Sequence, residues 1–156
     1  MEMGEGAMNV HGGGRQILMH GMALFLVGLV WGLYVPQTPF PRLALTAHIE
    51  FGVNGMQLML MAILLLKLPH SVGTRSMVVL VINAWLTWVM MASEICNAYW
   101  GTNGILPIAA AQAGATGGAS WQEMFVTLAH VIPGLTTIVA WALMILGFAR
   151  RRAEAA

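Results

Sequence analysis

Apolar residues gather in four long stretches, which are separated by short segments rich in proline or glycine. About 20 consecutive apolar residues are needed to cross the hydrocarbon core of a bilayer as an α-helix. Each stretch reaches that length. The pattern therefore predicts four transmembrane helices, at residues 16–35, 44–66, 77–99 and 124–148.

The connections between these spans differ in length and composition. The third is the long Gly/Ala/Ser-rich stretch 101–120, which is too weakly apolar to be a fifth span. We expect it to cap one mouth of the helices. The polar residues 1–15 are expected to form a flexible tail and the basic residues 150–156 a second tail, on either side of a single transmembrane domain, residues 16–149.

Composition agrees with this pattern. Of the 156 residues, 58% are hydrophobic and only 8% are charged, and the mean hydropathy is +0.75. Because a soluble domain carries about 25% charged residues, we expect an all-α, integral membrane four-helix bundle. The single cysteine, Cys96, excludes an internal disulfide and a thiolate metal cluster, and no basic run suggests nucleic acid.

Positive charges are distributed unequally between the two ends of the predicted bundle. With four spans, the termini and the middle connection share one side, which holds Arg15, Lys67, Arg75 and the three arginines at 150–152. The other side holds only Arg42. The positive-inside rule therefore predicts that both termini lie in the cytoplasm.

Polar side chains in the third and fourth spans fall on single helix faces. At about 100° per residue, each strip covers an arc of roughly 80°. Because lipid cannot hydrogen-bond them, such strips must face the bundle interior or a subunit contact. The residues are Asn83, Thr87, Glu94 and Asn97 in the third span, and Glu123, Thr127, His130 and Thr137 in the fourth.

The second span carries polar residues on two sides. Glu50, Asn54 and Gln57 share one face. His48 points roughly 120° or more away from it at 100° per residue. One narrow cavity cannot easily collect all four side chains, whereas a wide flat cofactor, or a subunit boundary beside His48, can accommodate them. The spacing indicates two environments around this span.

The polar residues also have plainer structural explanations. A histidine within a membrane span is either a metal ligand or hydrogen-bonded to a neighbouring helix. Glu123 and Thr127 offer His130 such partners on its own face. Glu94 has no cationic side chain in a nearby span, so it is either protonated or close enough to a mouth for water to reach it.

Aromatic and small residues add further expectations. Most tryptophans lie towards span ends, as interface anchors do, but Trp85 and Trp88 lie deeper and could line an aromatic pocket. His20 is expected to snorkel towards the interface. A small-residue face in the first span lets helices approach closely; it consists of Gly21, Gly28 and Gly32.

The segment Ala47–Met56, with the sequence AHIEFGVNGM, resembles the second helix of two related groups of bacterial membrane isomerases. These are the hydroxylaminobenzene mutases and the styrene oxide isomerases. The mutases are the nearer group, because Arg15, His20-Gly21 and Pro41-Arg42 also match their pattern. Phe51-Gly52 stands where the mutases tend to have glycine.

The resemblance implies a cofactor and an assembly. Styrene oxide isomerases are four-helix membrane proteins that form trimers and bind ferric haem b through a histidine of the second span. His48 matches that histidine, and Asn54 matches an active-site asparagine. Those isomerases also use an acidic residue and a tyrosine of the third span; here Asn83 falls near the acid, but Met91 stands at the tyrosine. This departure argues against styrene oxide as the substrate.

We therefore expect a membrane isomerase that rearranges an N-aryl hydroxylamine to a 2-aminophenol, with ferric haem b as Lewis acid. The resemblance places it as a homotrimer in the bacterial inner membrane, acting on small aromatic substrates. The expected roles are haem-iron ligand for His48, catalytic groups for Asn54, Glu50 and Asn83, and substrate-pocket lining for Trp85, Trp88, Met91 and Glu94.

Three alternatives remain open. An aryl epoxide isomerase would open the epoxide C–O bond and give an arylacetaldehyde. A haem b electron-transfer subunit would ligate its iron from two histidines, for which His48 and His130 are available. A small transporter is disfavoured by the lack of an internal repeat.

Overall fold

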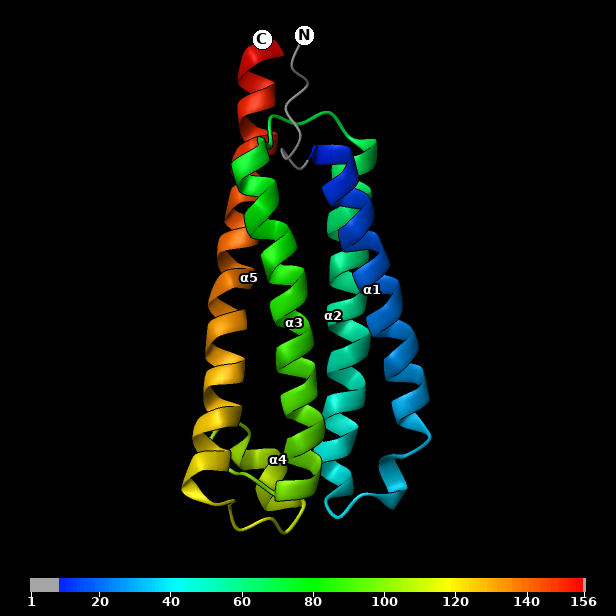
Figure 1. Ribbon diagram of the computed structural model, residues 1–156, viewed down its shortest axis with the longest axis vertical. Helices are drawn as coiled ribbons and strands as arrows, with labels where there is room; N and C mark the ends of the chain where they lie inside the picture. The colour runs from blue at the N-terminus through cyan, green and yellow to red at the C-terminus, as the bar shows by residue number, and fades with distance from the viewer. Residues whose placement is uncertain (1–8, 156) are drawn as a thin grey trace, which may run out of the picture.

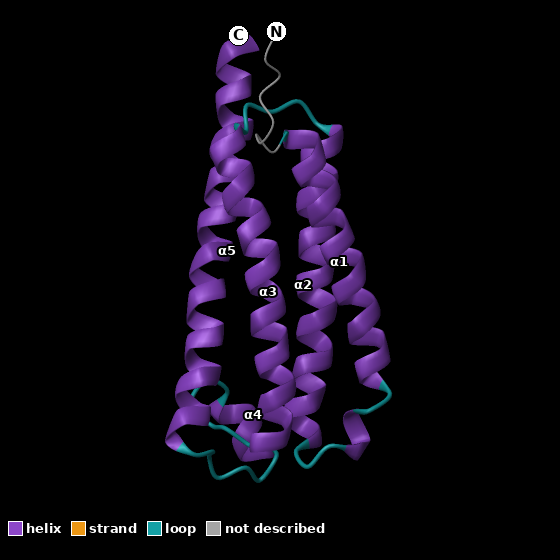
Figure 2. Cartoon of the chain, viewed as in Figure 1, coloured by secondary structure: helices purple, strands orange, loops and turns teal. Residues whose placement is uncertain are grey.

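The computed structural model describes residues 9–155, with side chains as far as Arg150. Within these residues it contains helices only (Figures 1 and 2). In chain order they are α1 (Val10–Gly32), the 3-10 turn η1 (Val35–Gln37), α2 (Pro41–Lys67), α3 (Thr74–Trp100), α4 (Pro107–Gln112) and α5 (Ser120–Ala155).

Four of these helices, α1, α2, α3 and α5, are long and apolar enough to cross a membrane. They run side by side along the long axis of the molecule (Figure 1), as a membrane four-helix bundle requires. The beginning of α1, the α2–α3 connection and the end of α5 lie at one end of the bundle, and α4 lies at the other. The all-helical prediction is therefore confirmed.

The terminal helices extend beyond the predicted spans. α1 begins at Val10 rather than residue 16, because the Asn9 side chain caps it by accepting a hydrogen bond from the Gly12 amide at 2.6 Å. α5 continues past residue 148 through Ala155. Apolar patterning marks only the part of a helix that fits the hydrocarbon, and a capped helix can continue beyond it. Residues 1–8 and 156 of the expected tails lie outside the described residues.

α1 and α2 form the most extensive helix pair, and their backbones touch. A Cβ atom on Gly21 would lie 2.8 Å from the Gly55 carbonyl oxygen, and one on Gly28 would lie 2.6 Å from the Phe51 Cβ. Without side chains at these positions the two helices approach to backbone contact. α3 packs against this pair, and α5 packs mainly against α3.

The connection between α3 and α5 is organised by one carboxylate. Glu123, in the first turn of α5, accepts hydrogen bonds from the amides of Asn103 at 3.0 Å, Gly104 at 3.0 Å and Gly118 at 2.8 Å. The connection includes α4, which packs on α2. Glu123 therefore ties both ends of the connection to the start of α5.

We predict that Gly21→Ala lowers the melting temperature of the detergent-solubilised protein. The added methyl group enters a backbone contact, and overpacking of this kind costs about 1–3 kcal/mol. Gly52→Ala is the matched control, because a Cβ at Gly52 meets nothing within 4 Å and alanine favours a helix. Equal melting temperatures for the two variants would contradict the close α1–α2 contact.

We also predict that Glu123→Gln loosens the α3–α5 connection. The neutral amide offers a single acceptor oxygen, and hydrogen bonds to charged groups contribute about 1.5–3 kcal/mol each. Hydrogen exchange should accelerate at the amides of Asn103, Gly104 and Gly118 while the α2 amides keep their protection. Unchanged exchange at all three amides would show that the carboxylate does not hold the connection.

Candidate active site

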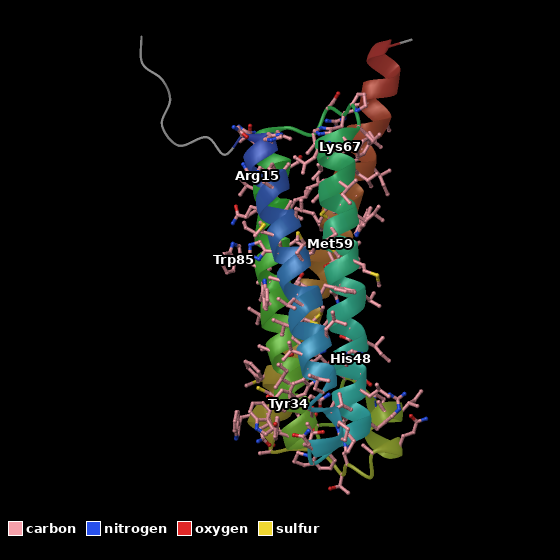
Figure 3. The ribbon with its side chains drawn as sticks, turned by 90° about the vertical axis from the view of Figure 1, so that its right-hand side faces the viewer. Arg15, Tyr34, His48, Met59, Lys67 and Trp85 are labelled. Carbon is pink, nitrogen blue, oxygen red and sulfur yellow. The ribbon has the colours of Figure 1, made fainter. Side chains whose placement is uncertain are left out.

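The His48 ring of α2 lies against α1, in the lower half of the view in Figure 3. Its Nδ1 atom is 2.8 Å from the Gly28 carbonyl oxygen. Because a carbonyl only accepts, Nδ1 carries the proton, and a neutral ring then keeps a lone pair on Nε2. A Cβ on Gly32 would lie 2.8 Å from the ring Cε1, so this glycine makes room for the imidazole.

This arrangement fits a metal-ligating imidazole. Histidine ligands characteristically donate one ring N–H to a carbonyl or carboxylate, which orients the ring and leaves the other nitrogen for the metal. The ring is only partly buried, so a bound group can reach it from outside the α1–α2 pair. The residues around His48 therefore fit an axial ligand for haem iron.

Three titratable side chains converge on the other side of α2. Glu50 of α2, Glu94 of α3 and His130 of α5 each offer one ligand atom, and these atoms lie within 4.8 Å of one another. The His130 Nε2 atom is paired directly with the Glu94 Oε1 atom. The His130 Nδ1 atom donates to the Val126 carbonyl oxygen at 2.7 Å.

The pairing of Glu94 with His130 corrects two expectations: His130 meets Glu94 of a neighbouring helix rather than a residue on its own face, and Glu94 does have an imidazole partner. Glu123 is turned towards the α3–α5 connection, so it does not serve His130. Glu94 is completely buried, and its Oε2 atom has no hydrogen-bond partner in the described part of the chain. The polar strips predicted on α3 and α5 do face one another. The pattern along one helix could not show, however, that Glu94 of one strip meets His130 of the other.

Asn54 lies one turn beyond Glu50 on the same face of α2. Its Nδ2 atom donates to the Glu50 carbonyl oxygen at 2.9 Å. This bond fixes the carboxamide and leaves its Oδ1 as the acceptor that can meet a substrate. Asn54 and Glu50 are therefore together, whereas His48 faces α1.

Asn83 is separate from this group. Its Oδ1 atom accepts hydrogen bonds from the hydroxyls of Thr136 at 3.1 Å and Thr137 at 2.9 Å. At about 1.5 Å of rise per residue it lies roughly 16 Å along α3 from Glu94. The structure therefore uses Asn83 to join α3 to α5 and does not bring it to Glu50 and Asn54.

The four residues expected to line one substrate pocket are not gathered. Trp85 is 57% exposed and projects from the bundle (Figure 3), with its ring 4.5 Å from that of His20. Trp88 donates from Nε1 to the His20 Nδ1 at 2.9 Å. Met91 is completely buried. Trp85 precedes Glu94 by nine residues, which is half a turn out of phase, so the two point in opposite directions.

His20 and His130 therefore have partners other than those expected. His20 accepts a hydrogen bond from a tryptophan of α3 instead of extending to the interface. His130 meets Glu94, and Glu50 lies beside them, whereas His48 faces α1. The two histidines do not face one cavity within the chain, which argues against a haem held by both.

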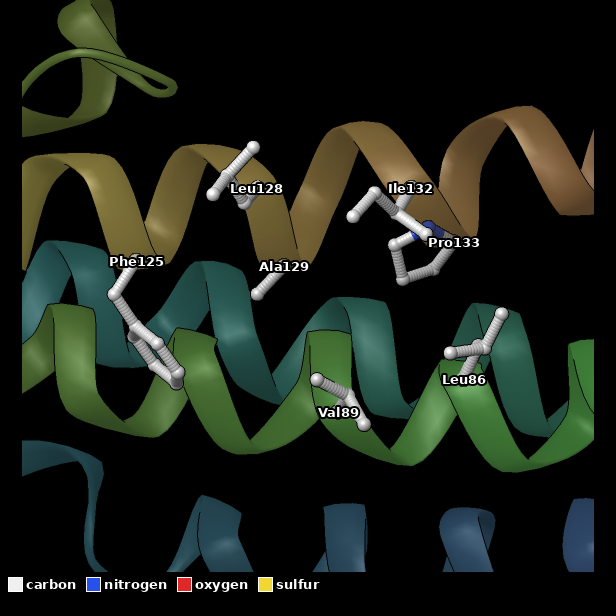
Figure 4. Close-up of a pocket in the computed structure, with 7 residues that line it drawn as sticks. All are labelled: Leu86, Val89, Phe125, Leu128, Ala129, Ile132 and Pro133. Carbon is white, nitrogen blue, oxygen red and sulfur yellow. The ribbon is translucent and has the colours of Figure 1, made fainter.

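An apolar pocket of about 210 Å³ lies between α3 and α5 (Figure 4). The sequence did not predict this pocket, because all of the side chains that line it are apolar. None of the residues expected in the active site lines it. The lining consists of Leu86, Val89, Phe125, Leu128, Ala129, Ile132 and Pro133.

Comparisons with known proteins agree with the resemblance in the second span. The styrene oxide isomerase family model matches residues 14–149. Hydroxylaminobenzene mutase HabB of Ectopseudomonas oleovorans is 32% identical over 148 residues, which cover 90% of this chain and 87% of HabB. Hydroxylaminobenzene mutase HabA of the same organism is 33% identical over 95 residues, covering 59% and 68%.

No solved structure matches the chain significantly. The family match covers most of the chain, including all three residues of the α2 segment that carry chemistry, His48, Glu50 and Asn54. The named relatives are mutases, which rearrange a single substrate molecule. The chain therefore belongs to the styrene oxide isomerase family and is an intramolecular isomerase with four apolar helices that suit a multi-pass membrane protein.

Proposed function

We propose that this isomerase is a hydroxylaminobenzene mutase, which converts an N-aryl hydroxylamine to a 2-aminophenol. The observation that carries the proposal is the His48 imidazole, oriented by the Gly28 carbonyl and accommodated by Gly32. The substrate class is supported by the similarity to HabB over 90% of the chain. Met91, which offers no phenol at the position of the isomerase tyrosine, supports it over an aryl epoxide.

The cofactor in this proposal is ferric haem b, held by the Nε2 atom of His48. A haem iron with one imidazole ligand supplies a Lewis acid that can polarise the oxygen of an N–O bond. The Gly28 carbonyl sets the orientation of the ligand ring. Since the ring is only partly buried, we propose that a second copy of the chain completes the haem pocket, in a homotrimer.

The reaction is balanced without any external donor. The N–O bond breaks, the hydroxyl group becomes attached to the ortho ring carbon, that carbon loses its proton, and the nitrogen gains one, so the product is an isomer of the substrate. The Asn54 carboxamide, fixed by the Glu50 carbonyl, would accept a hydrogen bond from the hydroxylamine and orient it. Exclusion of water by the surrounding helices would protect the electron-poor ring.

Glu50 was expected to be a catalytic group, but its position supports no separate role for it in the reaction. Its carboxylate lies beside the Glu94 carboxylate and the His130 imidazole. A proton on Glu50 would therefore be shared with these neighbours, and its position does not point to proton transfer by Glu50 alone. Asn83 and the two tryptophans lie elsewhere and are not assigned roles in the reaction. The proposed machinery is therefore His48 and Asn54. Because these two residues lie on different sides of α2, we propose that the substrate meets the haem on His48 of one copy and Asn54 of a neighbouring copy in the trimer.

We place the protein in the bacterial inner membrane with both termini in the cytoplasm. Arg15 and Lys67 lie at the end of the bundle where α1 begins (Figure 3). Arg42, by contrast, lies at the α4 end and bonds to Gln112 at 2.7 Å. The charge asymmetry supports this orientation, and a small apolar substrate would reach the site through the lipid.

We predict that the protein purified in detergent carries haem and converts hydroxylaminobenzene to 2-aminophenol, and that His48→Ala removes the Soret band together with turnover. His11→Ala, a change at an exposed histidine, is the matched control and should leave both unchanged. Styrene oxide is offered in parallel. Full turnover by the haem-free His48→Ala protein would refute the ligand assignment, and turnover of styrene oxide alone would transfer the proposal to epoxides.

We predict that Asn54→Ala keeps the haem spectrum and lowers kcat/KM for hydroxylaminobenzene about 100- to 1,000-fold, the usual effect of losing one oriented hydrogen-bonding group. Gln37→Ala is the control, because in the described part of the chain that carboxamide bonds to the Leu33 carbonyl alone, at the end of α1. Wild-type kcat/KM in Asn54→Ala, measured by product formation at several substrate concentrations, would remove Asn54 from the site.

A further inference from the structure

The cluster of Glu50, Glu94 and His130 is not explained by the proposed mutase chemistry. Its ligand atoms come from three different helices and lie within 4.8 Å of one another. Glu94 is completely buried, and its Oε2 atom has no partner in the described residues. Among these residues, Asn54 bonds only to the backbone of Glu50, so it does not reach that carboxylate.

The charges of this cluster do not balance by themselves. Two carboxylates face one imidazole, and burial of an unpaired charge in a low-dielectric interior is strongly unfavourable. The His130 Nδ1–H is committed to the Val126 carbonyl, so a neutral ring presents the Nε2 lone pair to the Glu94 carboxylate. A cation must lie at this contact, either a proton or a metal ion.

We propose that Glu50, Glu94 and His130 bind one divalent transition-metal ion, at a site distinct from His48. Two carboxylates and a neutral imidazole carry two negative charges, which a divalent ion neutralises. An ion about 2.0–2.2 Å from each ligand keeps ligand atoms roughly 3–4 Å apart, so small side-chain rotations suffice. Carboxylates and histidine projecting from several helices are a recurrent metal site in bundle cores.

The surroundings of His130 match those of a metal ligand. A ligating histidine usually donates its other ring N–H to a backbone carbonyl, which fixes the ring and the tautomer. The Val126 carbonyl does this at 2.7 Å, as the Gly28 carbonyl does for His48 at 2.8 Å. The unpartnered Glu94 Oε2 is then available as a second oxygen ligand to the same ion.

The ion would join α2, α3 and α5 in one contact. α5 packs mainly against α3, so Glu50 is the side chain through which α2 reaches His130. A ligand that binds only the folded state raises stability by mass action. The site therefore has a structural readout that does not depend on turnover or on haem.

The test uses the full chain, purified in detergent through a tag without histidines, treated with a chelator and dialysed against Zn²⁺. We expect about one zinc per chain by mass spectrometry of the metal content, together with a higher melting temperature. Glu94→Gln and His130→Gln should each weaken Zn²⁺ binding about 100-fold or more, since even outer partners contribute 10- to 100-fold. His11→Gln should bind as the wild type does.

The His48→Ala protein separates this site from the haem. It should still take up Zn²⁺. With Co²⁺ in place of Zn²⁺ it should show d–d absorption bands, and these bands should be absent from the double variant His48→Ala/Glu94→Gln. Two results would overturn the proposal: a zinc content at background in the wild type, or an equal zinc content in the wild type, Glu94→Gln and His130→Gln. Either result would leave a proton as the cation between His130 and Glu94. Loss of zinc in His48→Ala with its fold retained would equally overturn a separate site.

Discussion

The backbone contact between α1 and α2 is the constraint on which the rest of the structure depends. In a bilayer, lipid chains are as apolar as leucine, so helices associate through close packing and polar contacts rather than by hydrophobic exclusion from water. Gly21 and Gly55 place the two backbones within van der Waals contact. That same approach brings the Gly28 carbonyl to within hydrogen-bonding distance of the His48 ring. The close packing of α1 on α2 therefore also sets the orientation of the His48 imidazole.

α2 separates two different chemical environments. His48 and Glu50 are two residues apart, and side chains at that spacing point to nearly opposite sides of a helix. One faces the glycines of α1, and the other faces the polar strips of α3 and α5. A single helix thus contributes both to the proposed haem site and to the carboxylate–histidine cluster without bringing their charges into contact.

The polar strip of α3 joins α3 to α5 and to the connection that follows α3. Asn83 bonds to two threonine hydroxyls of α5, Glu94 pairs with His130, and the Asn97 Oδ1 accepts from the Thr102 hydroxyl. Buried polar atoms are normally paired, because an unsatisfied group retains its full desolvation penalty. The Nδ2 atoms of Asn83 and Asn97 and the Oε2 atom of Glu94 lack partners in the described residues. Such atoms are the places where a bound ion, water or substrate has most to contribute.

Much of the architecture was predictable from the sequence, because length and apolar content are local properties of each segment. Four spans, the close-packing glycines of α1 and the two-sided character of α2 all follow from counting along one helix. The resemblance in α2 also identified the isomerase family. The helix ends were less predictable, since the Asn9 cap and the continuation of α5 depend on polar residues outside the apolar pattern.

The contacts between helices were decided only by the tertiary structure. The spacing of residues along a helix predicts which of its side chains share a face, but it does not predict how neighbouring helices are rotated about their axes. For this reason Trp88 was grouped with Glu94, yet it meets His20. Likewise Glu123 and Thr127 were named as available partners for His130, yet His130 meets Glu94. The sequence by itself determined the helices and their polar faces; the rotation and packing of those helices decided which polar groups meet.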